Sequence, residues 1–413
     1  MTPSGVAMAA DSVITVQTRT TSAHYQSAEK LFRFSSRNPI GLMIHGSPSL
    51  LGIPWAPLIK QYRRLNIDPA PTLRDEAKSF LGYASSEIVK AAARGSTGLE
   101  AMKGEWLRQS VTAMSDRMKS EAVEASANAA GDPTTAMQLA LAKIANLQPP
   151  EREPLTSAEL DAETALLTDS DAADWARRTM ERIARVLRVD PRVIPFWAEL
   201  QQIWEPTLQA MMANLGRTPS RTGLVLAGYP GDSLLPELLA IDVDGMVGDT
   251  IRASVRYERA LHIGRLAAEA RAFGDVGPIL TQLDGVSPDR QRQDVGTVER
   301  LIEEVGDDSP EMVASLNNVL KYLHTYPRSR RESYLAALEI MPLAEMASTA
   351  ERLVGIARLH ASARLEPRTV GGPIDVAVIS RTDGFAWTER KLYWPAGLNP
   401  HLLGPPGPSY TAR

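Results

Sequence analysis

Residues Gly5–Asp11 read GVAMAAD, a short apolar run that ends on a carboxylate. Apolar runs of this length, bounded by small and polar residues, favour buried strands over helices. The runs Lys30–Phe34 (KLFRF) and Ile40–Ile44 (IGLMI) have the same texture and follow closely along the chain. The beginning of the sequence therefore predicts three short strands, and Asp11 stands at the end of the first.

The same texture returns in the middle and near the end of the chain. Thr222–Tyr229 (TGLVLAGY) and Leu238–Asp242 (LLAID) predict two strands, and Asp244-Gly245 predicts a turn after them. Ile374–Ser380 (IDVAVIS) predicts a closing strand, and Phe385–Thr388 predicts its partner. The predicted strands thus fall into three blocks that are far apart in sequence.

Helix-forming sequence separates these blocks, in Leu51–Leu65 and in Leu73–Gln148. Ser309 followed by Pro310 predicts a helix start, because a serine cap and a first-turn proline satisfy or remove unpaired N–H donors. In Met341–Leu365, apolar residues recur every three or four positions and form one face that packs on a sheet. Strand blocks with helices between them predict an α+β fold in which helices cover sheets.

The composition is that of an ordinary globular protein. Of 413 residues, 44% are hydrophobic and 23% are charged, and no apolar stretch has the length of a membrane-spanning helix. The net charge of -4 and a pI of about 6.0 argue against a nucleic-acid-binding surface. No signal peptide is visible at the N-terminus. We therefore expect a cytoplasmic protein that has no nucleic-acid or membrane partner.

Several kinds of chemistry find no support in the sequence. The chain has no cysteine, which excludes disulfides, thiolate metal sites and a cysteine nucleophile. Its six histidines have no spacing typical of metal ligands, and no glycine-rich phosphate loop occurs. We therefore expect no metal and no cofactor. His45, which precedes Gly46, is interpreted as a packed histidine at a strand end.

Three blocks of the sequence, taken in order, resemble β-type subunits of the proteasome, which belong to the N-terminal-nucleophile (Ntn) hydrolases. The first block comprises Gly5–Thr15, Ser27–Phe34 and Gly41–Ser47. The second is Leu224–Gly245, and the third is Val370–Phe385. The VGGPI motif that opens the third block is similar to the closing motif of the ancestral β-subunit group of bacterial proteasome relatives.

The resemblance implies a four-layer αββα sandwich and a threonine-type peptidase. In this chemistry a free N-terminal threonine is the nucleophile, and its own amino group is the base. By position, Asp11 matches the acidic residue that holds the essential lysine, and Lys30 matches that lysine. Gly46 matches the glycine of the oxyanion hole, and Ile44 matches a residue of the specificity pocket. The resemblance also implies a peptide substrate and a homo-oligomer.

Simpler interpretations of the same residues stay open. Asp11 could be only a turn residue at a strand end, Lys30 a solvated surface lysine, and Gly46 a plain tight turn. The interval between Asp11 and Lys30 is longer than in the family by a few residues, and a longer hairpin through Thr18–Thr21 would absorb the difference.

Two departures from the family affect the function. The strand that opens with the catalytic threonine has no counterpart before Gly5, so we expect it in an upstream segment; Thr2 is a poor candidate because it is followed by Pro3. Near the closing block, Pro367 and Val370 replace polar residues that assist the threonine. Two functions follow: an active peptidase or amide hydrolase whose nucleophile strand precedes Met1, or an inactive structural or binding subunit. An amidase with another nucleophile is a third alternative.

The chain is also longer than a typical subunit of the family. We assign residues 1–91, 221–276 and 334–400 to the Ntn-hydrolase core, 92–220 to a helical insertion and 277–333 to a second one. The tail, 401–413, is expected to be disordered. Three tryptophans of the first insertion are interpreted as core residues: Trp175, Trp197 and Trp204.

Overall fold

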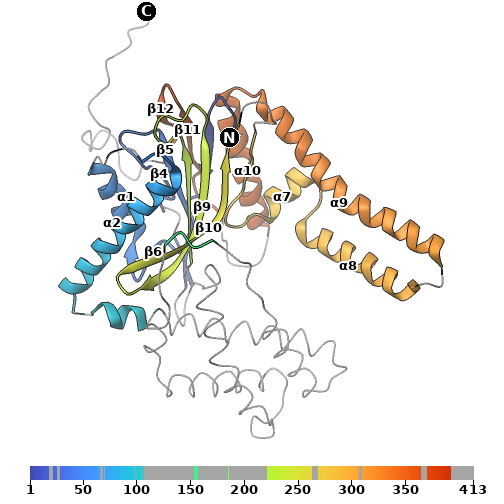
Figure 1. The fold of residues 1–413 in the computed structure, drawn as a ribbon, viewed down its shortest axis with the longest axis horizontal. Helices are drawn as coiled ribbons and strands as arrows, with labels where there is room; N and C mark the ends of the chain where they lie inside the picture. Colours follow the sequence, from blue (N-terminus) through green and yellow to red (C-terminus); the bar gives the residue numbers. More distant parts are fainter. Residues whose placement is uncertain are drawn as a thin grey trace, which may run out of the picture.

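The structure is a computed structural model. It describes residues 1–17, 22–25, 28–65, 68, 70–96, 98–104, 106, 153–156, 185, 221–262, 268–306, 309–363 and 370–391. These residues form antiparallel sheets flanked by helices, so the predicted α+β class is confirmed (Figure 1).

The larger sheet has five antiparallel strands in the order β10-β9-β8-β5-β4. Its central strand, β8, is buried along its whole length, as a continuous apolar run predicts for a strand covered on both faces. The strands of this sheet are β4 (Leu31–Arg33), β5 (Ile40–Gly46), β8 (Thr222–Gly228), β9 (Glu237–Val247) and β10 (Thr250–Ala260).

The turn predicted at Asp244-Gly245 is wrong, because β9 continues through it to Val247. The carboxylate of Asp244 is held inside the sheet by two hydrogen bonds from the Arg252 guanidinium on β10, of 2.8 and 2.6 Å. This pairing lets a charged side chain stay buried in a strand. Strand β10 itself was not predicted, since charged residues interrupt its apolar pattern.

The smaller sheet has three antiparallel strands in the order β1-β11-β12. It joins the two ends of the described chain, because β1 (Val6–Ala10) pairs with β11 (Asp375–Ser380), with Met8 opposite Ala377. Strand β12 (Gly384–Glu389) completes it. The predicted first and closing strands are therefore neighbours.

The two sheets face each other, and helices cover their outer faces (Figure 1). Apolar residues of both sheets, such as Met8 and Val225, share one core between them. Helices α1 (Trp55–Arg64) and α2 (Leu73–Arg94) pack on the other face of the five-stranded sheet around a second core. Helix α10 (Leu343–Ser362) packs on β1 and β11, within the region where a helix was predicted.

Two short hairpins adjust the connections near the start of the chain. Between Asp11 and Lys30, β2 (Ile14–Gln17) pairs with β3 (Ser22–Tyr25), so a hairpin lies in this interval, while the predicted turn at Thr18–Thr21 lies outside the described residues. Next, β6 (Ser49–Leu50) pairs with β7 (Ile53–Pro54). The helix predicted from Leu51 therefore begins only at Trp55.

Three helices occupy the region of the second predicted insertion. Helix α7 (Gly277–Asp284) packs against α10. Helices α8 (Pro288–Val305) and α9 (Pro310–Glu339) form a hairpin that extends away from the sheets (Figure 1). Helix α9 begins at the predicted position, Pro310, but the Ser309 side chain makes no capping hydrogen bond.

Most of the first predicted insertion lies outside the described residues, as do Trp175, Trp197, Trp204 and the tail. Residues 153–156 are described and run along the outer edge of β10. There, Leu155 N–H donates to the Ala253 carbonyl at 2.9 Å, and Val255 N–H donates to the Glu153 carbonyl at 2.9 Å. This segment covers a sheet edge whose polar groups would otherwise lack partners.

Candidate functional site

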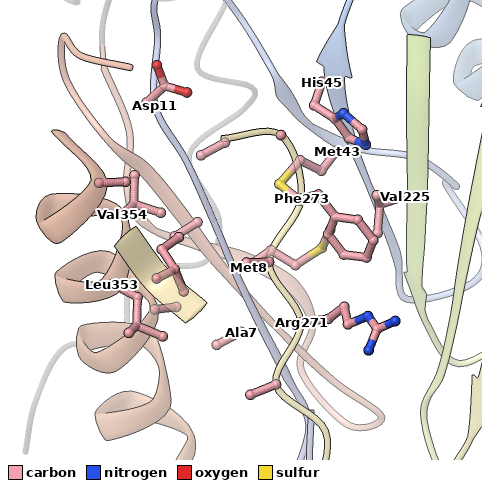
Figure 2. A pocket seen from close by; sticks show the side chains of 18 of the residues that line it. Ala7, Met8, Asp11, Met43, His45, Val225, Arg271, Phe273, Leu353 and Val354 are labelled. Carbon is pink, nitrogen blue, oxygen red and sulfur yellow. The ribbon is translucent and has the colours of Figure 1, made fainter. Parts of the chain in front are cut away.

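A cavity of about 560 Å³ lies between β1, the five-stranded sheet and α10. Figure 2 shows apolar side chains from each wall turned toward it, among them Met8 of β1, Val225 of β8 and Leu353 of α10. The segment 269–275 forms the wall opposite β1 and contributes Phe273. The cavity is therefore mostly apolar, with charged groups at particular points of its wall.

All three residues predicted for the site line this one cavity: Asp11, Lys30 and Gly46. The Lys30 ammonium lies 2.7 Å from Asp11 Oδ1, and the two side chains are only 16% and 13% exposed. The other carboxylate oxygen of Asp11 accepts hydrogen bonds from Val13 N–H at 3.0 Å and Gly371 N–H at 3.1 Å. Asp11 thus holds Lys30 and is itself held by backbone donors.

Gly46 ends β5 in a left-handed conformation, with φ of 77°. A Cβ atom there would lie 2.4 Å from the Arg221 carbonyl oxygen, so the position accepts only glycine. The following N–H, of Ser47, donates to the same Arg221 carbonyl at 2.9 Å. The backbone conformation and the close Arg221 carbonyl are enough to require glycine at position 46, even without a catalytic role.

The side chains of β5 that face the cavity are those of Met43 and His45 (Figure 2). Ile44, which matched the pocket residue by resemblance, also lines the cavity, although it belongs to the core beneath α1 and α2. The His45 ring stacks on Phe273, with ring centroids 5.9 Å apart. Burial, together with the nearby Arg256 guanidinium, lowers the pKa of His45 to about 4. The imidazole is therefore neutral at neutral pH.

The residues near Asp11 from the closing block act through the backbone. Val370 places an apolar side chain at the cavity wall, and its neighbour Gly371 donates to the Asp11 carboxylate. Pro367 lies outside the described residues. The Gly371 N–H thus supplies a hydrogen bond to Asp11 that the apolar side chain of Val370 cannot make.

Thr2 is not arranged as a nucleophile. Its side chain is fully buried, and its hydroxyl donates to the Met346 sulfur at 3.3 Å. The Met1 amino group donates to the Glu269 carbonyl at 2.8 Å. Burial lowers the pKa of this amino group to about 5, although the Glu269 carboxylate acts in the opposite direction.

Strand β1 has one edge that pairs with β11 and a second edge along which no described strand pairs. The cavity follows that second edge, because every residue from Val6 to Asp11 lines it. Unpaired backbone groups in such a place favour the addition of another strand. The cavity is thus an apolar slot beside an open strand edge, and Asp11 stands at one end of that strand.

Sequence reasoning missed the segment 269–275, which forms a wall of the cavity and brings Arg271 and Phe273 to it. The Arg271 guanidinium lies over the Tyr257 ring, 3.9 Å from its centroid. No local pattern in this stretch predicts a site, since its place depends on packing far from it in sequence.

Within the described part of the chain, no group of His, Asp and Glu side chains is arranged to hold a metal ion. In the same part, no helix has the length and apolar character needed to cross a membrane. Comparison of the chain with models of protein families, with curated proteins and with solved structures found no match.

Proposed function

We propose that this chain is a proteasome-like threonine-type peptidase or amide hydrolase with an Ntn-hydrolase sandwich, whose nucleophile is carried by a segment that pairs with the open edge of β1. The observation that carries the proposal is the Asp11–Lys30 pair, 2.7 Å apart in the wall of a cavity that follows this edge. The two facing sheets between helical layers are compatible with such a sandwich.

The role of Lys30 follows from its charge. An ammonium in a partly enclosed wall lowers the pKa of a neighbouring amine and stabilises negative charge that develops nearby. Asp11 keeps this ammonium in one position, and the Val13 and Gly371 N–H groups keep Asp11 in place. A lysine that was merely exposed to solvent would not need a carboxylate partner that is itself fixed by two backbone N–H groups.

The bound segment would add a strand to β1 and bring an N-terminal threonine to Lys30. An extended segment of about five residues matches the length of β1, at about 3.3 Å per residue. Its backbone would pair with the open edge of β1, and its apolar side chains would enter the slot. An open strand edge is costly to leave unpaired, which supports this occupant.

The reaction would proceed through an ester. The threonine hydroxyl oxygen attacks the carbonyl carbon of a peptide or amide bond, and the threonine amino group takes the hydroxyl proton. The tetrahedral oxyanion collapses, the C–N bond breaks, and that proton passes to the leaving amine. Water then hydrolyses the ester and restores the hydroxyl. The Gly46 N–H is the candidate donor to the oxyanion, because the Ser47 N–H already donates to the Arg221 carbonyl.

The test uses the protein expressed from its natural gene together with the codons that precede Met1. The purified protein is incubated with a β-lactone probe, and peptide mass spectrometry locates the adduct. We expect an adduct on an N-terminal threonine, and we expect Lys30→Met and Asp11→Asn to slow labelling by at least about tenfold. Labelling of another residue, or equal rates in both variants, would contradict the proposal.

A second candidate function is a non-catalytic structural or binding subunit with the same fold. It is favoured by the apolar side chain of Val370 and by the engagement of the Thr2 hydroxyl with Met346. In this case, the β1 slot would hold a strand that carries no nucleophile. An N-terminus that is not threonine in the natural protein, combined with absence of β-lactone labelling, would favour this function over the first.

A further inference from the structure

Basic side chains from three parts of the chain gather on one surface, outside the cavity. Three of them belong to α1, where spacings of three and four residues place Lys60, Arg63 and Arg64 on one face of the helix. The Glu29 carboxylate pairs with Lys60 and also lies 3.6 Å from the Arg390 guanidinium, so the chain that follows β12 reaches the same place. We call this set the α1 basic surface; it consists of Arg33, Lys60, Arg63, Arg64 and Arg390.

The positive charges of this surface lie close enough to act on one another. Burial, together with the nearby Arg33 and Arg64 guanidiniums, lowers the pKa of Arg63, and the Glu29 carboxylate acts in the opposite direction. Within the part of the chain that the structure describes, none of these three arginines forms an ion pair. Glu29 is only 14% exposed and already pairs with two cations. The surface therefore has a clear excess of positive charge, on a chain whose net charge is -4.

The structural role of these arginines explains only two of them. Arg63 and Arg64 lie in the last turn of α1, where positive side chains stabilise the C-terminal end of a helix. Arg33 and Arg390 lie outside α1, so this effect does not account for their position. Like charges that gather on one surface repel one another and lower the stability of the fold. The arrangement therefore favours a partner that supplies negative charge.

Two of the guanidiniums are held in place by their surroundings. Arg33 donates from Nε and Nη2 to the carbonyls of Ser35 and Ser36, at 3.3 and 3.4 Å. The Arg390 guanidinium lies over the Trp387 ring, 4.8 Å from its centroid. A guanidinium that is oriented in this way retains further N–H groups for a carboxylate, and it loses less side-chain entropy when it binds one.

We propose that the α1 basic surface is a docking site for a short acidic segment of a partner protein, whose carboxylates bind the guanidiniums of this surface. Arginine suits this partner because its planar group can donate two parallel hydrogen bonds to one carboxylate. The exposed side chains of Lys60 and Arg390, at 45% and 43%, lie at the rim of the surface and would add attraction at longer range.

The size and position of the surface favour this partner over others. A nucleic acid or a membrane extends well beyond five side chains and would meet the rest of a chain whose net charge is -4. Residues 392–413, which directly follow the described part of the chain, contain no Asp or Glu side chain that could neutralise the surface. None of the five side chains lines the cavity, so the proposal stands or falls separately from the proposed function.

The first test measures the binding of a fluorescent peptide, in which glutamate alternates with alanine, to the full-length protein at low ionic strength. Fluorescence anisotropy should show saturable binding, with a dissociation constant that rises at least about tenfold in Arg63→Gln with Arg64→Gln. The control, Arg300→Gln with Lys321→Gln, removes the same charge from exposed positions of α8 and α9 and should change the constant less than about twofold. Absence of binding, or equal effects of the two pairs, would overturn the proposal.

The second test compares the acidic peptide with other partners. A single-stranded oligonucleotide of the same net charge and vesicles that contain phosphatidylserine are titrated in the same way, and sedimentation equilibrium gives the mass of the natural chain and of Arg63→Gln with Arg64→Gln. We expect both polyanions to bind more weakly than the peptide, and we expect the two proteins to have the same mass. Tighter binding of either polyanion that the double variant loses, or a dimer that this variant disrupts, would assign the surface to that other partner and reject the proposal.

The third test separates direct carboxylate contacts from a general attraction. Glu29→Gln removes the acid that competes with the peptide for Lys60 and Arg390, so it should tighten peptide binding at least about threefold. Arg390→Lys keeps the charge but loses the planar group, so it should weaken binding at least about threefold. Circular dichroism checks that both variants remain folded. Unchanged or weaker binding by folded Glu29→Gln, or unchanged binding by Arg390→Lys, would show that the carboxylates do not bind here as proposed.

Discussion

The Asp11 carboxylate binds Lys30 through one oxygen, at 2.7 Å, and through the other it accepts the Gly371 N–H at 3.1 Å. One side chain at the end of β1 therefore ties the hairpin region at the start of the chain to the segment that enters β11. The contacts that orient the ammonium therefore also join the two ends of the fold.

Replacement of Asp11 by alanine should destabilise the protein by about 2–4 kcal/mol, because it leaves a partly buried ammonium and two backbone N–H groups without their acceptor. The free energy of unfolding from urea titration measures the effect. Asp68→Ala is a matched control, since Asp68 is 90% exposed and pairs with Arg37 on the surface. That pair should contribute less than about 1 kcal/mol. Equal losses in both variants would show that the Asp11 network has no special structural role.

Gly46→Ala should cost more stability than Gly52→Ala, although both glycines have a left-handed backbone, with φ of 77° and 80°. A Cβ at Gly46 would lie 2.4 Å from the Arg221 carbonyl oxygen, whereas a Cβ at Gly52 meets nothing within 4 Å. The backbone strain alone is about 1 kcal/mol, and we expect the collision to add about 1–3 kcal/mol at Gly46. Similar melting temperatures for the two variants would contradict this.

Stability should fall as the pH falls through the range set by His45. Because the pKa of His45 is lowered from 6.5 to about 4 in the folded state, the unfolded chain takes up this proton first. The folded state therefore loses stability between about pH 6.5 and pH 4, by up to about 3 kcal/mol, and gains nothing from this group above pH 7.

The measurement is the urea midpoint of the natural chain and of His45→Gln at several pH values. Other groups titrate alike in both proteins, so the difference between them isolates His45. The urea midpoints of the two proteins should change with pH in the same way near pH 7. Below pH 6, the midpoint of the natural chain should fall more steeply. Parallel curves throughout would mean that His45 titrates normally.

Arg252→Met should destabilise the fold by about 3–5 kcal/mol, because it leaves the buried Asp244 carboxylate without its guanidinium. The double variant Arg252→Met, Asp244→Leu should recover most of this loss, since it removes both charges from the sheet. Thermal unfolding of the two variants and the natural chain measures the comparison. A double variant less stable than the single one would show that the pair is needed for more than mutual neutralisation.

Several elements were predictable from the sequence because their signals are local. The apolar runs at β1, β5, β8 and β11 each mark a buried strand, and Pro310 marks the start of α9. The charged strand β10 was not predictable in this way, because the burial of Arg252 depends on Asp244 across the sheet.

The candidate site divides in the same manner. Asp11, Lys30 and Gly46 could be named from the sequence, since each stands at a strand end within a recognisable block. The sequence could not predict that the Met43 side chain points into the cavity while Ile44 packs on the other face of the sheet. A shift of one residue along a strand moves a side chain to the other face.

The sequence by itself determined the class of the fold, the places of most strands and the residues that form the Asp11–Lys30 pair. Only the tertiary structure decided that these residues share one cavity with the segment 269–275, and that β1 has an edge beside it along which no described strand pairs. The reason is physical: local patterns specify whether a segment is a strand or a helix, whereas cavities and edges arise where segments distant in sequence pack or fail to pack.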